Sequence, residues 1–281
     1  MNPKSTLELI LSGVGIVAIT AFVLSRPSFD LTSEPQDTET PVPGSVSGTR
    51  ETSQSASDEN SDTQTQSASN PTPPPDDSAR LSGIDVSHYQ GNIDWVTVKS
   101  TGVLFAYAKA TDGLTYTDPK FASNQTGATA QGLAFGAYHF YEPQDDPIAQ
   151  AKHFLSVAKV GKGWLPAVLD LERSPGSNDP TSLADGAEQW LQYVEGNTGC
   201  KPMVYASPTF YNQYLGAAFS KYPLWLAEYA NSAKLPTGVS AWQIWQHSQK
   251  GRVDGVSGNV DLDWFAGDAS ALKAFLCGDG G

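Results

Sequence analysis

Cationic residues are scarce in this chain, and their scarcity excludes one large class of partner. Only 17 Lys and Arg face 30 Asp and Glu over 281 residues, giving a formal net charge of -13 with no basic stripe. Phosphate recognition needs clustered Lys and Arg, so nucleic acid is not expected as a partner. Ten acids and two bases lie between Pro27 and Arg80, so the remainder is only mildly acidic.

Motifs of cofactor and metal chemistry are also missing. The chain has no GxGxxG or GxxxxGK[ST] stretch, which removes the usual nucleotide-binding patterns. It has four His and no HxxxH or HExxH pattern, so neither a metal site nor a cofactor is expected. His139 is interpreted as a buried or supporting histidine. Ser87 and His88 lack the nucleophile elbow of serine hydrolases.

One long apolar run lies near the N-terminus. Residues 7–24 contain only one acid and two hydroxyl side chains, and Lys4 and Arg26 flank them. About 18 residues meet the lower limit for a membrane-spanning helix and exceed a usual signal-peptide core. We favour an uncleaved signal anchor over residues 1–26, with a cleaved signal peptide as the alternative. The rest is then exported, either anchored to the inner or cytoplasmic membrane or secreted.

A polar segment, residues 27–80, follows the apolar run. It is rich in Ser, Thr, Pro and acids, has scarcely an aromatic residue and ends in PTPPPDD. Such a segment cannot bury enough apolar surface to offset the entropy of ordering, so we expect a disordered tether. The composition changes at Leu81, and residues 81–281 are expected to form one monomeric catalytic domain.

Apolar β-rich runs alternate with helical stretches in this domain. VLFAYAKA and AFGAYHFY are apolar throughout, as is typical of parallel strands covered on both faces. The pattern predicts an irregular, TIM-like α/β barrel of eight strands, the last of which lack full helices between them. A flat doubly wound sheet is the alternative. Strands are expected at 82–87, 103–109, 134–140, 166–172, 202–206, 223–229, 241–246 and 258–263, and helices at 94–100, 119–131, 146–159, 181–197, 208–216 and 268–277.

The stretch VLDLE, residues 168–172, carries the strongest signal for chemistry. Side chains of a strand alternate between faces, so Asp170 and Glu172 share one face while Leu169 and Leu171 share the other. Two close carboxyls push their pKa values apart, which lets one site hold an acid and a base. Two solvated acids at a strand edge are the alternative for this pair alone.

Two further acids are expected at the same rim. Asp85 closes the first expected strand and Asp261 lies in the last, and barrel closure brings these strands together. The fourth strand, with Asp170 and Glu172, faces them across the mouth. Repulsion among four carboxyls needs an offsetting function, so the group predicts a catalytic site.

Aromatic residues and an amide occur at the later strands. Flat rings pack on the apolar faces of sugars, so we select Tyr205, Trp225, Tyr229 and Trp245 as candidate sugar-binding residues, with core packing as the alternative for each. Strand parity places Trp225 and Tyr229 on one face. Gln246 is a candidate hydrogen-bonding partner of an acetamido group.

The chain has two cysteines, Cys200 and Cys277. An exported domain can oxidise them, and closing a loop of this length adds about 4–5 kcal/mol of stability in the chain-entropy treatment. We expect a disulfide, with two free thiols as the alternative.

Six segments in order, together covering residues 82–266, resemble the motifs of the family 25 glycoside hydrolases, which are lysozyme-like N-acetylmuramidases. They are GIDVSHYQGNIDW, FAYAKATDG, GAYHFY, AVLDLE, LWLAEY and WQIWQHSQKGRVDGVSGNVDLDWF. The resemblance implies an irregular β/α barrel and hydrolysis of the β-1,4 bond between N-acetylmuramic acid and N-acetylglucosamine in peptidoglycan. It implies that Glu172 is the catalytic acid, Asp170 its partner, and Asp85 and Asp261 supporting residues.

This sequence departs from the family pattern at three positions. Asp112 stands where Glu is expected, Glu228 lies within LWLAEY, and Asp263 stands where Asn is common. None of the three is among the four acids.

The residues themselves suggest a mechanism. Glu172, desolvated beside a charged Asp170, is expected to have a raised pKa and to protonate the leaving oxygen. Asp170 is too close for a water-activating base, because inverting pairs stand about 6.5–9.5 Å apart. We therefore predict that the 2-acetamido group of the substrate attacks the anomeric carbon with net retention, oriented by Asp170. Direct attack by Asp170 is the alternative.

Two other functions are compatible with the same barrel. A non-catalytic glycan-binding module of the cell wall is one, although it would not need four mutually repulsive acids. A glycosidase acting on chitin-like polymers is the other, because the sequence contains no recognisable contact with the lactyl group.

Overall fold

The structure, a computed structural model, describes residues 80–176 and 180–278. The expected anchor at residues 1–26 and the expected linker at 27–80 lie outside these ranges, apart from Arg80. Within the described ranges, no helix combines the length and apolar character needed to span a membrane.

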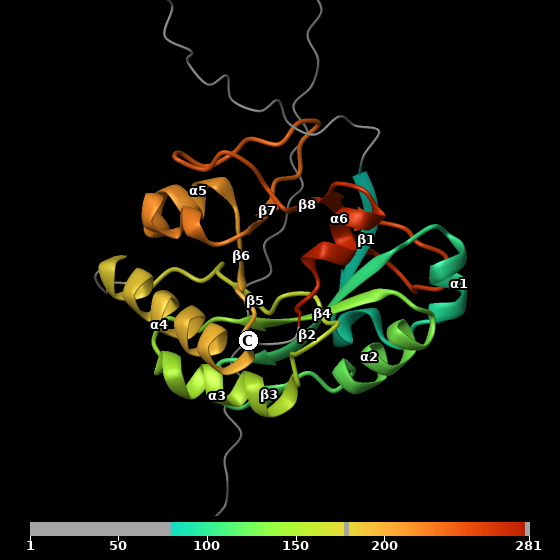
Figure 1. The fold of residues 1–281 in the computed structure, drawn as a ribbon, viewed down its shortest axis with the longest axis horizontal. Helices are drawn as coiled ribbons and strands as arrows, with labels where there is room; N and C mark the ends of the chain where they lie inside the picture. Colours follow the sequence, from blue (N-terminus) through green and yellow to red (C-terminus); the bar gives the residue numbers. More distant parts are fainter. Residues whose placement is uncertain (1–79, 177–179, 279–281) are drawn as a thin grey trace, which may run out of the picture. The chain divides into compact units, whose positions relative to one another are not determined.

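Eight strands close into a barrel, which confirms the predicted architecture (Figure 1). β1 pairs with both β2 and β9, and these pairings join the two edges of the sheet. The two-residue strand β3 is an addition to the edge of β2. The strands are β1 (Arg80–Val86), β2 (Phe105–Asp112), β3 (Tyr116–Thr117), β4 (Ala134–Phe140), β5 (Val168–Asp170), β6 (Met203–Ala206), β7 (Leu224–Ala227), β8 (Ile244–Gly251) and β9 (Val260–Ala266).

The last strand runs against the others, a feature that the apolar pattern does not reveal. Seven of the eight barrel strands run parallel to one another, and the exception is β9, which is antiparallel to both β8 and β1. Residues 252–259 join β8 to β9 without a helix. Because β9 is reversed, its beginning lies beside the end of β1, and Asp261 stands opposite Asp85 in the ladder.

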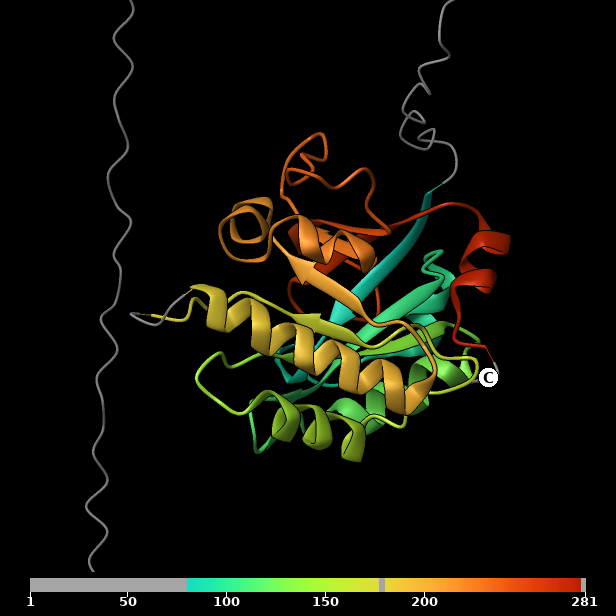
Figure 2. The ribbon, with the colours of Figure 1, turned by 60° about the vertical axis from the view of Figure 1, so that its left-hand side comes forward.

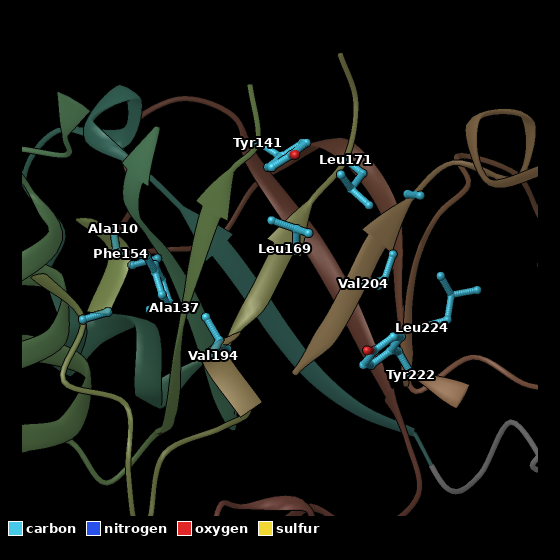
Figure 3. Packing of buried hydrophobic residues seen from close by; sticks show 14 of the residues in the cluster. Ala110, Ala137, Tyr141, Phe154, Leu169, Leu171, Val194, Val204, Tyr222 and Leu224 are labelled. Atoms are coloured by element: carbon cyan, nitrogen blue, oxygen red, sulfur yellow. The ribbon is translucent and has the colours of Figure 1, made fainter. Parts of the chain in front are cut away.

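Helices cover the outside of the barrel along its first half. They are α1 (Trp95–Ser100), α2 (Phe121–Ala130), α3 (Pro147–Val157) and α4 (Pro180–Thr198). α3 and α4 lie side by side (Figures 1 and 2). Figure 3 shows Leu169 and Val204 on the outer face of their strands, in one apolar cluster with Phe154 of α3 and Val194 of α4. The outward-facing side chains of VLDLE, Leu169 and Leu171, are therefore buried in this cluster.

The later connections are irregular, as the short gaps between strands predict. The expected helix over 208–216 is instead three residues of α5 (Pro208–Phe210) followed by a π-helical turn, Tyr211–Leu215. It ends at Gly216, whose φ of 64° suits glycine. α6 (Ala269–Phe275) is the last helix, and its Leu272 belongs to the apolar cluster inside the barrel.

Aromatic rings from β2 fill the barrel interior by lying over glycines of the neighbouring strands. Phe105 stands opposite Gly83 of β1, and Tyr107 stands opposite Gly136 of β4. A Cβ at Gly136 would lie 2.1 Å from the Tyr107 ring, so only glycine fits there. The interior is therefore a packed core rather than a channel, and it supports the open end of the barrel from below.

Cys200 and Cys277 are joined by a disulfide, with Cα atoms 5.4 Å apart. The bond ties the connection after α4 to the segment after α6, across 77 positions of the sequence. Replacing both cysteines by Ser should lower the free energy of unfolding by about 2–5 kcal/mol. Thermal unfolding should then show a melting temperature roughly 5–15 °C lower. An equal melting temperature for the variant and the oxidised wild type would contradict a stabilising disulfide.

Candidate active site

A polar pocket opens where the parallel strands end. Its cavity volume is about 190 Å³. Eight of the nine catalytic and sugar-binding candidates line it, together with Tyr138 and Gln249. The eight are Asp85, Asp170, Glu172, Tyr205, Trp225, Tyr229, Gln246 and Asp261. Residues from strands far apart in the sequence thus meet in one concave site, as the barrel architecture requires.

One wall of the pocket is formed by the end of β5. Asp170 is its last residue and is buried, whereas Glu172 lies two residues further on and is exposed. Leu169 and Leu171 belong to the outer apolar cluster, so the two acids share the inner face. The alternation expected for VLDLE therefore continues beyond the hydrogen-bonded strand.

The carboxyls of Asp170 and Glu172 interact directly. Burial raises the pKa of Asp170 well above its usual value, and the neighbouring Glu172 raises it further. Glu172 has an exposed side chain, but partial desolvation of its carboxyl in the pocket raises its pKa, while its hydrogen bond with Asp170 opposes the change. Two carboxylates have acceptors only, so this contact requires one proton between them. The dyad can thus supply a proton while it keeps one negative charge.

One carboxylate oxygen of Asp170 lacks a hydrogen-bond donor within the described residues. Its Oδ1 is buried, and no group in the described part of the chain donates a hydrogen bond to it. A buried acceptor without a donor costs free energy, so this oxygen is suited to an N–H or O–H group of a ligand.

Lys109 supplies positive charge beside the dyad, and the sequence reasoning did not select it. Its Nζ lies 2.8 Å from Oδ2 of Asp112 and 4.5 Å from the centre of the Phe140 ring. Its charge acts to lower the pKa of both Asp170 and Glu172, against the effect of burial. A lysine near the end of the otherwise apolar run FAYAKA was the available signal. Asp112, one of the departures from the family pattern, is its ion-pair partner.

The opposite wall is organised by the Gln246 amide. Its Nε2 donates to Oδ2 of Asp85 over 2.7 Å. Its Oε1 accepts from the hydroxyls of Tyr205 at 2.8 Å and Tyr229 at 2.7 Å. Four candidate residues from four different segments are thereby held in one hydrogen-bonded network, so each restricts the position of the others.

Asp261 completes the acidic rim. Burial raises its pKa to about 6, and the charge of Glu172 contributes to the rise. The effect of Glu172 shows that the two walls act on each other electrostatically. A positive charge that develops on a ligand between them would meet negative groups on both sides.

The aromatic candidates separate into floor and rim. Trp225 is 2% exposed, and its ring centre lies 4.8 Å from that of Tyr107 in the barrel interior. Tyr229 is 49% exposed, so its ring can reach a sugar. Trp245 was a wrong candidate, because it adjoins Gln246 on the opposite face of β8. It packs in the outer cluster, with Nε1 donating to the Glu228 carbonyl at 2.7 Å.

His139 is a core residue, as interpreted from the sequence. It is fully buried and hydrogen-bonded at both ring nitrogens, to Thr111 and Gln150. Burial lowers its pKa to about 4, so it is neutral at physiological pH. Across residues 80–176 and 180–278, no group of three or more His, Cys, Asp or Glu side chains is arranged to hold a metal ion.

Two residues that line the pocket, Tyr138 and Gln249, were not predicted from the sequence. Tyr138 follows Gly136 on the inner face of β4, and strand parity alone would have indicated it. Gln249 lies three residues after Gln246, so parity would place the two on opposite faces. Irregular pairing between Gln246 and Gly251 shifts the register and brings both to the pocket.

The sequence and the fold of this chain are similar to those of known glycosyl hydrolases. The family model described as glycosyl hydrolases family 25 matches residues 84–256. The chain is 39% identical over 203 residues to the uncharacterized protein YegX of Escherichia coli K12, covering 70% of this chain and 74% of that protein. It is 38% identical over 216 residues to lysozyme M1 of Streptomyces globisporus, covering 71% and 72%. The crystal structure of a bacterial lysozyme from Streptomyces coelicolor superposes with a TM-score of 0.67 at 37% identity, over 70% of this chain and 96% of that one.

Proposed function

Since this chain belongs to family 25 of the glycosyl hydrolases, we propose that it is an N-acetylmuramidase acting on peptidoglycan. The bond cleaved is the β-1,4 linkage between N-acetylmuramic acid and N-acetylglucosamine. The observation that carries the proposal is the Asp170 and Glu172 dyad, which faces Asp85 and Asp261 across one polar pocket.

Glu172 acts as the general acid in this proposal. It is the more exposed member of the dyad, so its proton can reach the glycosidic oxygen of a bound strand. Its raised pKa keeps it protonated at higher pH than an ordinary glutamate. Activity should therefore fall as the pH rises through that pKa, because the proton donor is lost.

Asp170 acts as the orienting and stabilising charge. Its donor-free Oδ1 is suited to the N–H of the substrate 2-acetamido group. Accepting that hydrogen bond favours the charged form of Asp170, so the proton of the dyad passes to Glu172. The acetamido oxygen then attacks the anomeric carbon, and the glycosidic bond breaks as Glu172 donates its proton. Water opens the cyclic intermediate and gives a proton back to Glu172.

This mechanism fixes the stereochemistry of the product. Two displacements at the anomeric carbon give net retention, so proton NMR of freshly formed product should show the β-anomer of the new reducing sugar before mutarotation. Initial appearance of the α-anomer would rule out substrate assistance and direct attack by Asp170 alike.

Parallel digestion of two polymers tests the function itself. Purified peptidoglycan should release soluble muropeptides on incubation with the enzyme, whereas chitin should remain intact. Chitin hydrolysis at a similar rate would favour the glycosidase alternative. Binding to peptidoglycan without release of soluble products would favour a non-catalytic module.

We also propose that residues 7–24 anchor the enzyme in the inner or cytoplasmic membrane, with the catalytic domain outside the cytoplasm and residues 27–80 as a tether. The support is the length of the apolar run and the polar composition that follows it. The full chain should sediment with membranes and be digested by protease added to spheroplasts. A shortened chain in the medium would indicate cleavage of a signal peptide instead.

A further inference from the structure

A second carboxyl pair lies beneath the pocket, and the proposed reaction does not use one of its members. Asp263 is 1% exposed and lies two residues after Asp261 on β9, so both side chains share one face of that strand. In the ladder with β1, Asp261 stands opposite Asp85 and Asp263 stands opposite Gly83. Asp263 is therefore diagonal to Asp85 across the two paired strands.

Other side chains donate hydrogen bonds to only some of the carboxylate oxygens of Asp85 and Asp263. Oδ1 of Asp263 accepts from Nε1 of Trp225 at 2.9 Å. Oδ2 of Asp263 is buried, and no donor in the described part of the chain reaches it. Oδ2 of Asp85 accepts from Gln246 at 2.7 Å. The two carboxyls also act on each other, because charge and hydrogen bonding between them contribute to the pKa shifts of both.

Such a contact cannot form between two charged groups. Carboxylates have acceptors only, and two unscreened negative charges at hydrogen-bond distance repel strongly in a buried site. A single proton removes one charge and supplies the donor that the Asp263 Oδ2 atom lacks. We propose that Asp85 and Asp263 share one proton, and that Asp263 is thereby a positioning residue that holds Asp85 in place beneath the sugar site.

The surroundings favour retention of this proton over a wide pH range. Burial raises the pKa of both acids well above the usual value, and Asp261 raises both further. The tyrosines that interact electrostatically with the pair are Tyr107 of β2, Tyr138 of β4, Tyr205 of β6 and Tyr229 after β7, and burial raises the pKa of each. These tyrosines stay neutral while the pair titrates. Gln246 of β8 and Trp225 of β7 contribute fixed donors.

The shared proton makes the folded state less stable as the pH rises. The folded chain keeps a proton that the unfolded chain releases near the ordinary pKa of aspartate, so stability falls as the pH rises between the unfolded and folded pKa values. Asp263→Asn removes this proton while its amide oxygen can still accept from Trp225 and its amide nitrogen can donate to Asp85. The melting temperature of the variant should therefore fall less steeply with rising pH than that of wild type.

Melting curves of four variants between about pH 4 and pH 8 test the pair. In Asp263→Asn the fall in melting temperature should be shallower than in wild type by up to roughly 3–5 °C per pH unit, the slope of one proton for a domain of this size. Asp85→Asn should give the same flattening, and the double variant no more than either single one. Asp254→Asn, the same change at an exposed site, should leave the slope unchanged. Parallel curves for wild type and Asp263→Asn, or additive flattening in the double variant, would overturn the shared proton.

The positioning role of Asp263 rests on the proposed function, and the pH dependence of kcat tests it separately. The ratio of kcat for Asp263→Asn to kcat for wild type on peptidoglycan should rise with pH, because only the wild type loses the shared proton. A ratio that stays constant with pH would show a merely structural role and overturn this part. If the wild type cleaved no glycan, the proposed function would fail, whereas the melting curves would still decide whether the proton is shared.

Discussion

Replacing Glu172 by Gln should lower the rate of peptidoglycan hydrolysis by at least about 10²–10⁴-fold, the usual contribution of a positioned general acid. Gln keeps the shape of the side chain but cannot donate a proton of suitable acidity to the leaving oxygen. The rate is measured as muropeptide release from purified cell wall. Binding of the glycan should be retained, so the loss should fall on kcat rather than on KM.

The fold provides the control for this variant. An acid with a raised pKa makes the folded state less stable as the pH rises, so Glu172→Gln should melt at neutral pH no lower than wild type. Glu195→Gln offers the same chemical change at a surface ion pair with Lys201, and should leave the rate unchanged. Near-normal activity in a folded Glu172→Gln variant would refute the assignment of the acid.

Replacing Asp170 by Asn should cost about 10²–10³-fold in kcat, the scale for removing one group that stabilises transition-state charge. Asn is nearly isosteric and retains an acceptor for the acetamido N–H. It lacks the negative charge that stabilises the positive cyclic intermediate, and it also removes the carboxyl that shares a proton with Glu172. The rate on cell wall and its pH profile are the measurements, with the exposed Asp185→Asn as the matched control.

Azide separates the two possible roles of Asp170. A small external nucleophile can replace a missing enzyme nucleophile, but it cannot replace a charge that orients the acetamido group. Added azide should therefore leave the rate of Asp170→Asn unchanged. Rescue of activity with formation of a glycosyl azide would contradict substrate assistance and favour direct attack by Asp170.

The barrel was predictable because its strands carry two local signals. Long apolar runs such as AFGAYHFY indicate strands covered on both faces, and alternation in VLDLE indicates which side chains face inward. These signals depend only on neighbouring residues. They place strands near all eight positions and bring together acids that lie more than 170 residues apart, Asp85 and Asp261.

The features that escaped prediction depend on contacts between segments. The apolar pattern of β9 is the same in either direction, so the sequence does not indicate that this strand is reversed. Irregular pairing in β8 breaks the parity rule and moves Gln249 into the pocket. The positions of Lys109 beside the dyad and of Asp263 beside Asp85 become evident only when neighbouring strands are in register.

The pKa shifts of the site likewise depend on contacts that the sequence alone does not reveal. In isolation Asp170 and Glu172 are two ordinary acids, and neither burial nor the nearby Lys109 can be read from spacing. The sequence does suggest that their pKa values separate. The structure adds that Asp170 is the more buried of the two and has an acceptor without a donor.

The identity of the sugar at the new reducing end tests the central claim most directly. Peptidoglycan is digested with the wild-type enzyme, the products are reduced with borohydride, and the reduced sugars are identified by mass spectrometry after acid hydrolysis. Cleavage by an N-acetylmuramidase should convert N-acetylmuramic acid to its alditol, and the Glu172→Gln variant should yield none. Reduced N-acetylglucosamine as the principal product would contradict the proposed activity, because it would show that the other glycosidic bond of the strand is cut.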